Sequence, residues 1–329
     1  LSSFTPAGEV KALNNVTLQM REGEVLGIVG ESGSGKSVTA YSIMGLTAQN
    51  GKIVGGSVEF NGHKIHEMSE KELRKIRGNE VSIIFQDPMT SLNPVWTVGN
   101  QIAEAVSLHT DKKGRAAMER AKELLELVGI NEPEKRLKQY PHELSGGMRQ
   151  RVMIAIALAC EPKLLIADEP TTALDVTIQA QILDLLRGLK DKINSSIMLI
   201  THDLGVIAEM ADYVVVMYSG RVVEAGTAKE IFSNPSHPYT IGLMASKPVV
   251  GKHVDKLYSI PGKVPNPINM PNYCYFRDRC DRRMPCCDGA YPGEIYLSET
   301  HRVSCYLYDE ASKNTIAEKE TSDVQVREG

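Results

Sequence analysis

The chain has 329 residues, of which 42% are hydrophobic and 24% charged, enough to bury the core of one large domain with an appendage, or of two domains. Its longest apolar run, Val152 to Cys160, is far shorter than the roughly 20 residues of a bilayer span, and no charged-then-apolar leader opens the chain, so we expect neither a membrane-embedded nor a secreted protein. The formal net charge of -4 lacks the basic excess typical of phosphate-backbone binding, which argues against nucleic acid as a partner.

Short apolar runs alternate with longer segments of helical periodicity, as is typical of an α/β protein with a parallel sheet. The predicted strands are Val25–Val29, Val81–Phe85, Leu164–Ala167 and Ile197–Ile200. Between Ser57–Phe60 and His63–Ile65, the dipeptide Asn61-Gly62 predicts a tight turn. We therefore expect an antiparallel β hairpin beside the parallel core.

The pattern is wholly helical from about Val98 to Ala159, with an amphipathic repeat in Ala116–Val128, and predicts an α-helical subdomain inserted at about residues 97–159. Strand signals then return. Tyr213–Tyr218 and Arg221–Glu224 predict a second hairpin, followed by a helix at Ala228–Phe232.

Composition changes towards the end of the chain. After about Lys247 the sequence becomes rich in Pro, Cys and Tyr with little periodicity, and from Asp309 it is polar and charged. We expect a main domain over residues 1–245, a small irregular Cys-rich extension over 246–308, and a tail over 309–329 that does not order.

The first chemical motif is a buried strand that runs into a glycine-rich loop and then a helix. The loop, Gly30-Glu31-Ser32-Gly33-Ser34-Gly35-Lys36-Ser37, matches G-x-x-x-x-G-K-S. Its backbone N–H groups are expected to surround a phosphate, with Lys36 reaching the β and γ oxygens and Ser37 ligating Mg²⁺. The flanking strand and helix favour this over an ordinary strand-to-helix turn.

A second motif supplies two carboxylates. Asp168 and Glu169 follow the apolar strand Leu164–Ala167. Asp168 is expected to hold Mg²⁺, directly or through water, and Glu169 to accept a proton from the attacking water.

A third motif, Leu144-Ser145-Gly146-Gly147-Met148-Arg149-Gln150, resembles the signature of ATP-binding cassette (ABC) proteins. In that family, backbone N–H groups of the signature bind the γ-phosphate of ATP held by the opposite subunit. The sequence agrees, because Ser145-Gly146-Gly147 precedes a strong helix at Met148–Leu158. Three more segments match the cassette in order, at Gln86 (Q-loop), Leu174-Asp175 (D-loop) and His202 (H-loop).

The resemblance implies a P-loop NTPase core of the ABC ATPase type over residues 1–245, with ATP and Mg²⁺ as cofactors. The ATP contacts it implies are Gly30, Ser32, Gly33, Ser34, Gly35, Lys36, Ser37, Val38, Gln86, Asp168 and His202, and from a second subunit Ser145, Gly146, Gly147 and Asp175. It implies Mg²⁺ ligands at Ser37, Gln86 and Asp168, and catalytic roles for Glu169, His202 and Gln86. The family's adenine-stacking aromatic is missing from Thr5 to Val10, where Phe4 is the nearest candidate.

Segments around and beyond the cassette narrow the resemblance to the ATPase subunits of dipeptide and oligopeptide importers. These segments are Asp87–Pro94, Tyr140-Pro141-His142-Glu143 and Phe232–Thr240. The cysteines Cys274, Cys280, Cys287 and Cys305 resemble the C-terminal [4Fe–4S] motif of that subfamily, with Cys286 as the alternative to Cys287. Zinc is the competing occupant, and disulfides are the weakest option in the cytosol.

The resemblance thus implies an ATP-hydrolysing subunit that energises import of dipeptides or oligopeptides from the cytoplasmic face of the membrane. Its implied partners are a second, homologous and non-identical ATPase subunit, two transmembrane permease subunits and, indirectly, an extracytoplasmic peptide-binding protein. Three alternatives remain: a soluble cassette ATPase acting on nucleic acid or ribosomes, an exporter ATPase, and an importer of another cargo such as a metal chelate.

Overall fold

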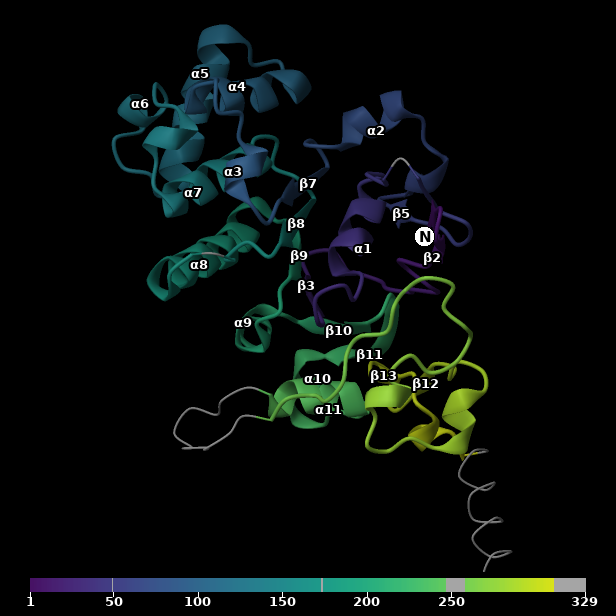
Figure 1. Ribbon diagram of the computed structural model, residues 1–329. Helices are drawn as coiled ribbons and strands as arrows, with labels where there is room; N and C mark the ends of the chain where they lie inside the picture. Colours follow the sequence, from purple (N-terminus) through teal and green to yellow (C-terminus); the bar gives the residue numbers. More distant parts are fainter. Residues whose placement is uncertain (49, 173, 247–257, 311–329) are drawn as a thin grey trace, which may run out of the picture.

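The computed structural model describes residues 1–48, 50–172, 174–246 and 258–310. Its centre is a mixed eight-stranded sheet of order β12-β13-β11-β10-β3-β9-β8-β7 (Figure 1). Five strands are parallel: β3 (Val25–Val29), β7 (Val81–Ile84), β8 (Leu164–Asp168), β9 (Ser196–Ile200) and β10 (Tyr213–Tyr218). β11 (Arg221–Thr227) turns back antiparallel to β10. The predicted α/β core is therefore confirmed.

The central strands are buried on both faces, as their continuous apolar runs predict. Successive residues of β3 alternate between two core clusters: Val25 and Val29 pack on one side of the sheet, and Leu26 and Ile28 on the other. The helices around the sheet are α1 (Lys36–Ile43), α8 (Val176–Ile193) and α9 (Leu204–Met210). β7 ends one residue earlier than predicted, whereas β8 continues through Asp168, so Gln86 and Glu169 both follow strand ends at the same edge.

Antiparallel β structure lies beside this core. One small sheet has the order β2-β1-β4, from β1 (Ser2–Thr5), β2 (Gly8–Val10) and β4 (Gly51–Lys52). The predicted hairpin is also present but shorter, as β5 (Glu59–Phe60) and β6 (His63–Lys64). Its turn residues Asn61 and Gly62 have φ of 48° and 78°, as a tight hairpin turn needs. A 3-10 turn starts at Ile65 and ends the second strand, and α2 (Glu70–Ile76) follows.

After α3 (Pro88–Ser91), the segment predicted as helical at about residues 97–159 contains α4 (Val98–His109), α5 (Gly114–Leu127), α6 (Pro133–Arg136), a 3-10 turn at Pro141–Glu143 and α7 (Gly146–Ala157). Ile102, Leu124 and Ile154 bring α4, α5 and α7 into the core. Helix α7 begins earlier than the expected Met148 because the Ser145 side chain caps it. In Figure 1 these helices form the lobe at the upper left. No helix in the described part of the chain is long and apolar enough to cross a membrane.

After α10 (Ala228–Ser233) and α11 (Pro238–Ala245), residues 258–310 form what we call the C-terminal segment. It consists of 3-10 turns at Arg277–Arg279, Pro285–Asp288 and Tyr306–Tyr308, and of the short strands β12 (Ile295–Tyr296) and β13 (Arg302–Val303). Strand β13 pairs with β11 and so extends the main sheet. The predicted tail lies, from residue 311 onwards, outside the described residues.

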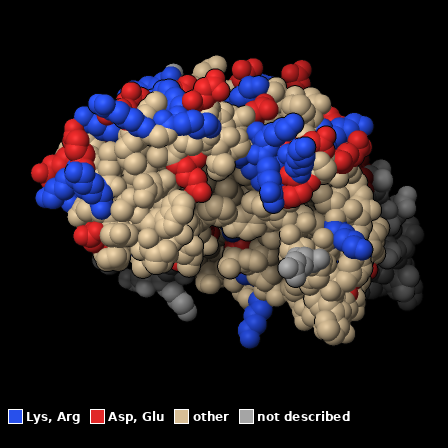
Figure 2. Space-filling model, turned by 90° about the horizontal axis from the view of Figure 1, so that it is seen from above, with Lys and Arg blue, Asp and Glu red and all other residues tan. Residues whose placement is uncertain are grey.

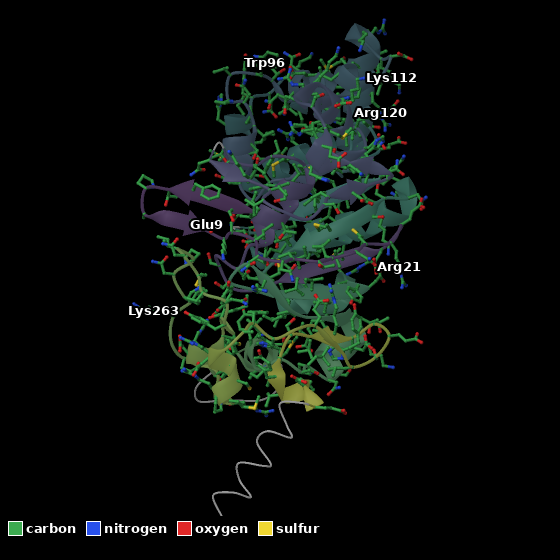
Figure 3. All side chains as sticks on the ribbon, turned by 90° about the vertical axis from the view of Figure 1, so that its right-hand side faces the viewer. Glu9, Arg21, Trp96, Lys112, Arg120 and Lys263 are labelled. Carbon is green, nitrogen blue, oxygen red and sulfur yellow. The ribbon has the colours of Figure 1, made fainter. Side chains whose placement is uncertain are left out.

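The C-terminal segment also reaches the N-terminal sheet. Val10 forms a β bridge with Ile268, and the Glu9 backbone exchanges hydrogen bonds with Asn269. Figure 3 shows Glu9 and Lys263 on the same side of the molecule. The N-terminal sheet and the C-terminal segment are thus in direct contact.

Candidate nucleotide-binding site

The glycine-rich loop connects β3 to α1 and is shaped by positions that exclude side chains. Gly30 has φ of 154°, and a Cβ there would lie 2.2 Å from the Met217 carbonyl oxygen. Lys36 Nζ donates to the carbonyl oxygens of Gly30 at 2.8 Å and Glu31 at 3.0 Å, which curls the loop around the ammonium group. Burial lowers the pKa of Lys36, and the carboxylates of Glu169, Asp168 and Glu31 oppose this shift.

The loop contains one buried hydroxyl that lacks a partner. Ser34 is 2% exposed, and its Oγ makes no hydrogen bond. An unpaired buried hydroxyl at the start of a helix is suited to the oxygen of an anion. Of the other predicted contacts, Ser32 and Gly33 are exposed, Gly35 has φ of 99° in the turn, and Val38 is half-buried in the first turn of α1. The loop therefore has the composition and the orphan donor of a phosphate site.

A pair of oxygen ligands lies where the metal is expected. Ser37 Oγ donates to Asp168 Oδ1 at 2.9 Å, and Tyr41 OH donates to Asp168 Oδ2 at 3.3 Å. Burial raises the pKa of Asp168. Hydroxyl and carboxylate oxygens are the donors that Mg²⁺ prefers, so these residues fit the ion. Tyr41 escaped the sequence analysis, although its position four residues after Ser37 on one helix face could have indicated it.

The three predicted catalytic side chains come together from three strand ends. Gln86, after β7, donates through Nε2 to Glu169 Oε2 at 3.0 Å, and His202 Nδ1, after β9, lies 3.6 Å from the same oxygen. Thr172 Oγ1 also donates to it, at 2.8 Å. Glu169 itself has φ of 48°, a left-handed backbone conformation that is rare for glutamate. Gln86 thus contacts Glu169, whereas Ser37 and Asp168 contact each other.

Thr172 was missed by the sequence analysis. It lies three residues after Glu169, in a turn whose backbone N–H at 172 bonds to the Glu169 carbonyl oxygen. A hydroxyl residue at that spacing after a strand-end carboxylate is the signal that could have found it.

The signature residues lie on the surface at the start of α7. Ser145 and Gly146 are exposed, and Ser145 Oγ accepts from the Met148 N–H at 3.3 Å. Asp175 caps α8 in the same way, accepting from the Ile178 N–H at 3.0 Å. Gly147 packs against Ile178, whose Cγ2 would lie 2.8 Å from an added Cβ. The signature and the D-loop aspartate are thus exposed at the starts of two helices that contact each other through Gly147 and Ile178.

Four cysteines of the C-terminal segment line one small cavity. They are Cys274, Cys280, Cys287 and Cys305, together with His237 and Phe276, whereas Cys286 is not among the lining residues. Burial raises the pKa of Cys274 to about 11 and that of Cys305 to about 12.

Backbone N–H groups lie near the four sulfurs. The Met284 N–H donates to Cys287 Sγ at 3.5 Å, and nearby backbone N–H groups partly offset the rise that burial causes in the pKa of Cys274, Cys280 and Cys305. Within the described ranges, no three side chains of His, Cys, Asp or Glu form a group that could hold one metal ion. The cavity thus brings four thiol side chains together.

Phe4, the nearest aromatic to the expected adenine-stacking position, lies on β1 opposite Glu9 and is 51% exposed. Its ring is accessible at the N-terminal sheet, and its role at adenine stays a prediction.

Comparison with known proteins matches both parts of the chain. A family model described as ABC transporter matches residues 13–172, and one described as oligopeptide/dipeptide transporter, C-terminal region, matches residues 223–287.

Two relatives from Bacillus subtilis (strain 168) match nearly the full length. The oligopeptide transport ATP-binding protein AppD is 53% identical over 93% of this chain and 94% of its own, and the dipeptide transport ATP-binding protein DppD is 48% identical over 98% and 97%. A solved dimeric ATP-binding cassette, bound to ADP and Pi in a post-hydrolysis state, is 30% identical with a TM-score of 0.63, over 69% of this chain and 95% of its own. With this sequence and this site, the chain belongs to the ABC transporter family as an ATP-hydrolysing, ATP-binding subunit of the oligopeptide/dipeptide importer group.

Proposed function

We propose that this subunit energises the import of oligopeptides or dipeptides. The observation that carries the proposal is the match of residues 223–287 to the C-terminal region of oligopeptide/dipeptide transporters, a region that lies outside the ATPase motifs. Relatives that cover at least 93% of the chain are named for the same two cargo classes.

In the proposed mechanism, Glu169 is the general base. It takes a proton from the water whose oxygen attacks the γ-phosphorus of ATP, while the bond from that phosphorus to the leaving ADP oxygen breaks. Gln86 and Thr172 hold Glu169 in place through their hydrogen bonds, and His202 lies next to it. Lys36 and the N–H groups of the phosphate loop stabilise the phosphate charge.

Ser37 and Asp168 would hold Mg²⁺, which supplies charge neutralisation on the β- and γ-phosphates when it is bound. Gln86 is the third proposed Mg²⁺ ligand, and it also donates a hydrogen bond to Glu169. The oxygen donors and the orphan Ser34 hydroxyl support this assignment.

A second ATPase subunit completes each site in the proposal. Ser145, Gly146 and Gly147 would bind the γ-phosphate held by the partner, and Asp175 would lie at the same interface. Exposure of the signature supports this, as does that of Val176, which is 81% exposed beside Asp175. We propose that the partner is homologous and non-identical.

The two transmembrane permease subunits are proposed to dock on the helical lobe. A groove there is lined by Val95, Trp96 and Tyr140, among others, and Val95 is 74% exposed. In Figure 3, Trp96 lies at the top of the molecule, opposite the C-terminal segment.

Figure 2, which views the molecule from above, shows Lys and Arg interspersed with Asp and Glu, without one basic field of the kind that nucleic acid needs. Docking of the permeases on the helical lobe would place the subunit on the cytoplasmic face of the membrane. The peptide-binding protein would act only through the permeases.

We further propose that residues 246–308 form an extension that binds a [4Fe–4S] cluster through Cys274, Cys280, Cys287 and Cys305. Four thiols around one cavity fit the ligand set of such a cluster. Cys287 lines the cavity and Cys286 does not, which supports Cys287 as the fourth ligand. Zinc is less well supported, because the cysteine spacings lack the paired C-x2-C of common zinc sites.

Metal analysis of anaerobically purified protein tests the cluster. About four irons and four sulfides per chain are expected for a [4Fe–4S] cluster. Cys287→Ser should lose the iron and the visible absorbance, whereas the matched neighbour variant Cys286→Ser should retain both. Zinc in place of iron, or loss on Cys286→Ser alone, would contradict the assignment.

The cargo is tested in liposomes that contain the complete importer. ATP-dependent accumulation of labelled di- or oligopeptides is expected, and it should stop when the subunit is omitted. Transport of a metal chelate with no peptide transport, or recovery of the subunit with ribosomes instead of membrane proteins, would refute the proposal.

A further inference from the structure

A buried arginine of the C-terminal segment contacts the phosphate loop. Arg279 forms two hydrogen bonds with the carboxylate of Glu31, from Nη1 to Oε2 at 2.6 Å and from Nη2 to Oε1 at 3.0 Å. Paired N–H donors on a carboxylate form the strongest type of ion pair and also fix its orientation. Glu31 is the second residue of the loop, between Gly30 and Ser32.

Glu31 is held through each of its polar groups. Its backbone N–H donates to Tyr239 OH at 2.8 Å, and its carbonyl oxygen accepts from Lys36 Nζ at 3.0 Å. Its carboxylate is the group bound by Arg279. A shift of Glu31 would therefore change the position of the loop backbone and of the Lys36 ammonium group together.

Arg279 is itself fixed in one orientation. Its side chain is 5% exposed, Nε donates to the Pro261 carbonyl oxygen at 2.8 Å, and Nη2 donates to that of Ile260 at 3.3 Å. The guanidinium also lies 5.7 Å from the ring centroid of Tyr218. Tyr218 packs in turn against Tyr239. The contact is thus built into the core and is not a surface ion pair of small net effect.

We propose that Arg279 is a positioning residue of the ATP site, which holds the phosphate loop through Glu31 and makes the C-terminal segment a working part of nucleotide binding. The proposal goes beyond the cargo and cluster assignments and depends on neither. Because Arg279 directly precedes Cys280, whatever orders the cysteines also orders the loop. Linkage then requires that nucleotide binding and order of the C-terminal segment favour each other.

The sign of one substitution separates positioning from charge. Glu31→Gln removes a negative charge near the phosphates, so a purely coulombic role for Glu31 predicts tighter binding of MgATP. Positioning predicts the opposite, because the amide can no longer hold the paired bonds with Arg279. We expect Glu31→Gln and Arg279→Gln each to weaken MgATP affinity about tenfold, the scale of one hydrogen bond to a charged group. KM for ATP should rise equally, with kcat changed less than about threefold.

The experiment measures fluorescent-nucleotide affinity on the full-length subunit, and KM and kcat in the assembled importer. The double variant Glu31→Gln/Arg279→Gln should resemble either single variant, because the two residues act through one contact. Arg283→Gln is the matched control. Arg283 lies in the same segment, where it pairs with Asp278 and Asp288, and this variant should leave affinity within about twofold.

Three results would overturn the proposal: MgATP affinity that is unchanged or tighter in Glu31→Gln, additive losses in the double variant, or an equal loss in Arg283→Gln. If Arg279→Gln fails to fold, Glu31→Gln decides alone, because Glu31 is partly exposed and its substitution preserves side-chain size. A lower melting temperature with unchanged affinity would assign the pair a purely structural role.

Discussion

Replacing Glu169 by glutamine should stop ATP turnover and preserve ATP binding. Both Gln86 and Thr172 donate to the same carboxylate oxygen, Oε2. The carbonyl oxygen of glutamine can take that place and accept both bonds, so the fold of the site should survive. The amide nitrogen that replaces the other oxygen cannot accept a proton. The change therefore removes the base and little else.

The expected fall in kcat follows from the loss of the general base alone. General-base catalysis contributes about 10²- to 10⁴-fold, so kcat should fall by that factor, an increase of about 3 to 5 kcal/mol in the activation free energy. The affinity for MgATP should remain within about threefold of the unmodified protein, because the phosphate loop, Ser37 and Asp168 are unchanged.

Phosphate release by the assembled importer measures the turnover, and fluorescent-nucleotide titration measures the binding. Glu22→Gln, at an exposed glutamate, is the control of equal chemistry and should behave as the unmodified protein. Hydrolysis by Glu169→Gln within tenfold of the unmodified rate would refute the assignment of Glu169 as the base. Loss of ATP binding would instead refute the claim that glutamine preserves the site.

Two further predictions concern the helical lobe and the C-terminal segment. Trp96→Ala should weaken permease association by about 2 kcal/mol, roughly 30-fold, with MgATP affinity unchanged, as co-purification can measure. Leu108, an exposed apolar residue outside the groove lining, provides the control, and an equal loss in Leu108→Ala would contradict the prediction. Burial would raise the pKa of Glu230, but hydrogen bonds from Ser298 and Thr300, among others, outweigh it and lower the pKa to about 2. The resulting stabilisation is present above about pH 4.5 and is lost as pH falls through about 2, so Glu230→Gln should cost about 1 kcal/mol at pH 7 and nothing near pH 2, as urea unfolding across pH can show.

The sequence was sufficient for the parts of the fold whose signals are local. Continuous apolar runs and the spacing of Gly30, Lys36 and Ser37 predict a buried strand, a loop and a helix, because backbone geometry leaves few alternatives there. The parallel order of the strands then brings Gln86, Glu169 and His202 to one edge, as the predicted motifs require.

The sequence pattern does not predict contacts between distant segments. The pairing of β13 with β11 involves two residues of each strand and leaves no periodicity to read. The bond between Glu31 and Arg279 joins residues 248 positions apart, and arginine in a loop gives no sign of its partner. Burial of the cysteines around one cavity likewise depends on how the C-terminal segment folds back, which composition alone does not determine.

The same long-range bond bears on the order of events during synthesis. Glu31 of the phosphate loop leaves the ribosome early, whereas Arg279 follows 248 residues later. A nascent chain can therefore form β3 and α1 well before Arg279 is available to bind Glu31. Closing so long a loop is slow compared with forming the local helices and turns. A newly made subunit should consequently reach its full ATP affinity late, only after Arg279 has docked on Glu31.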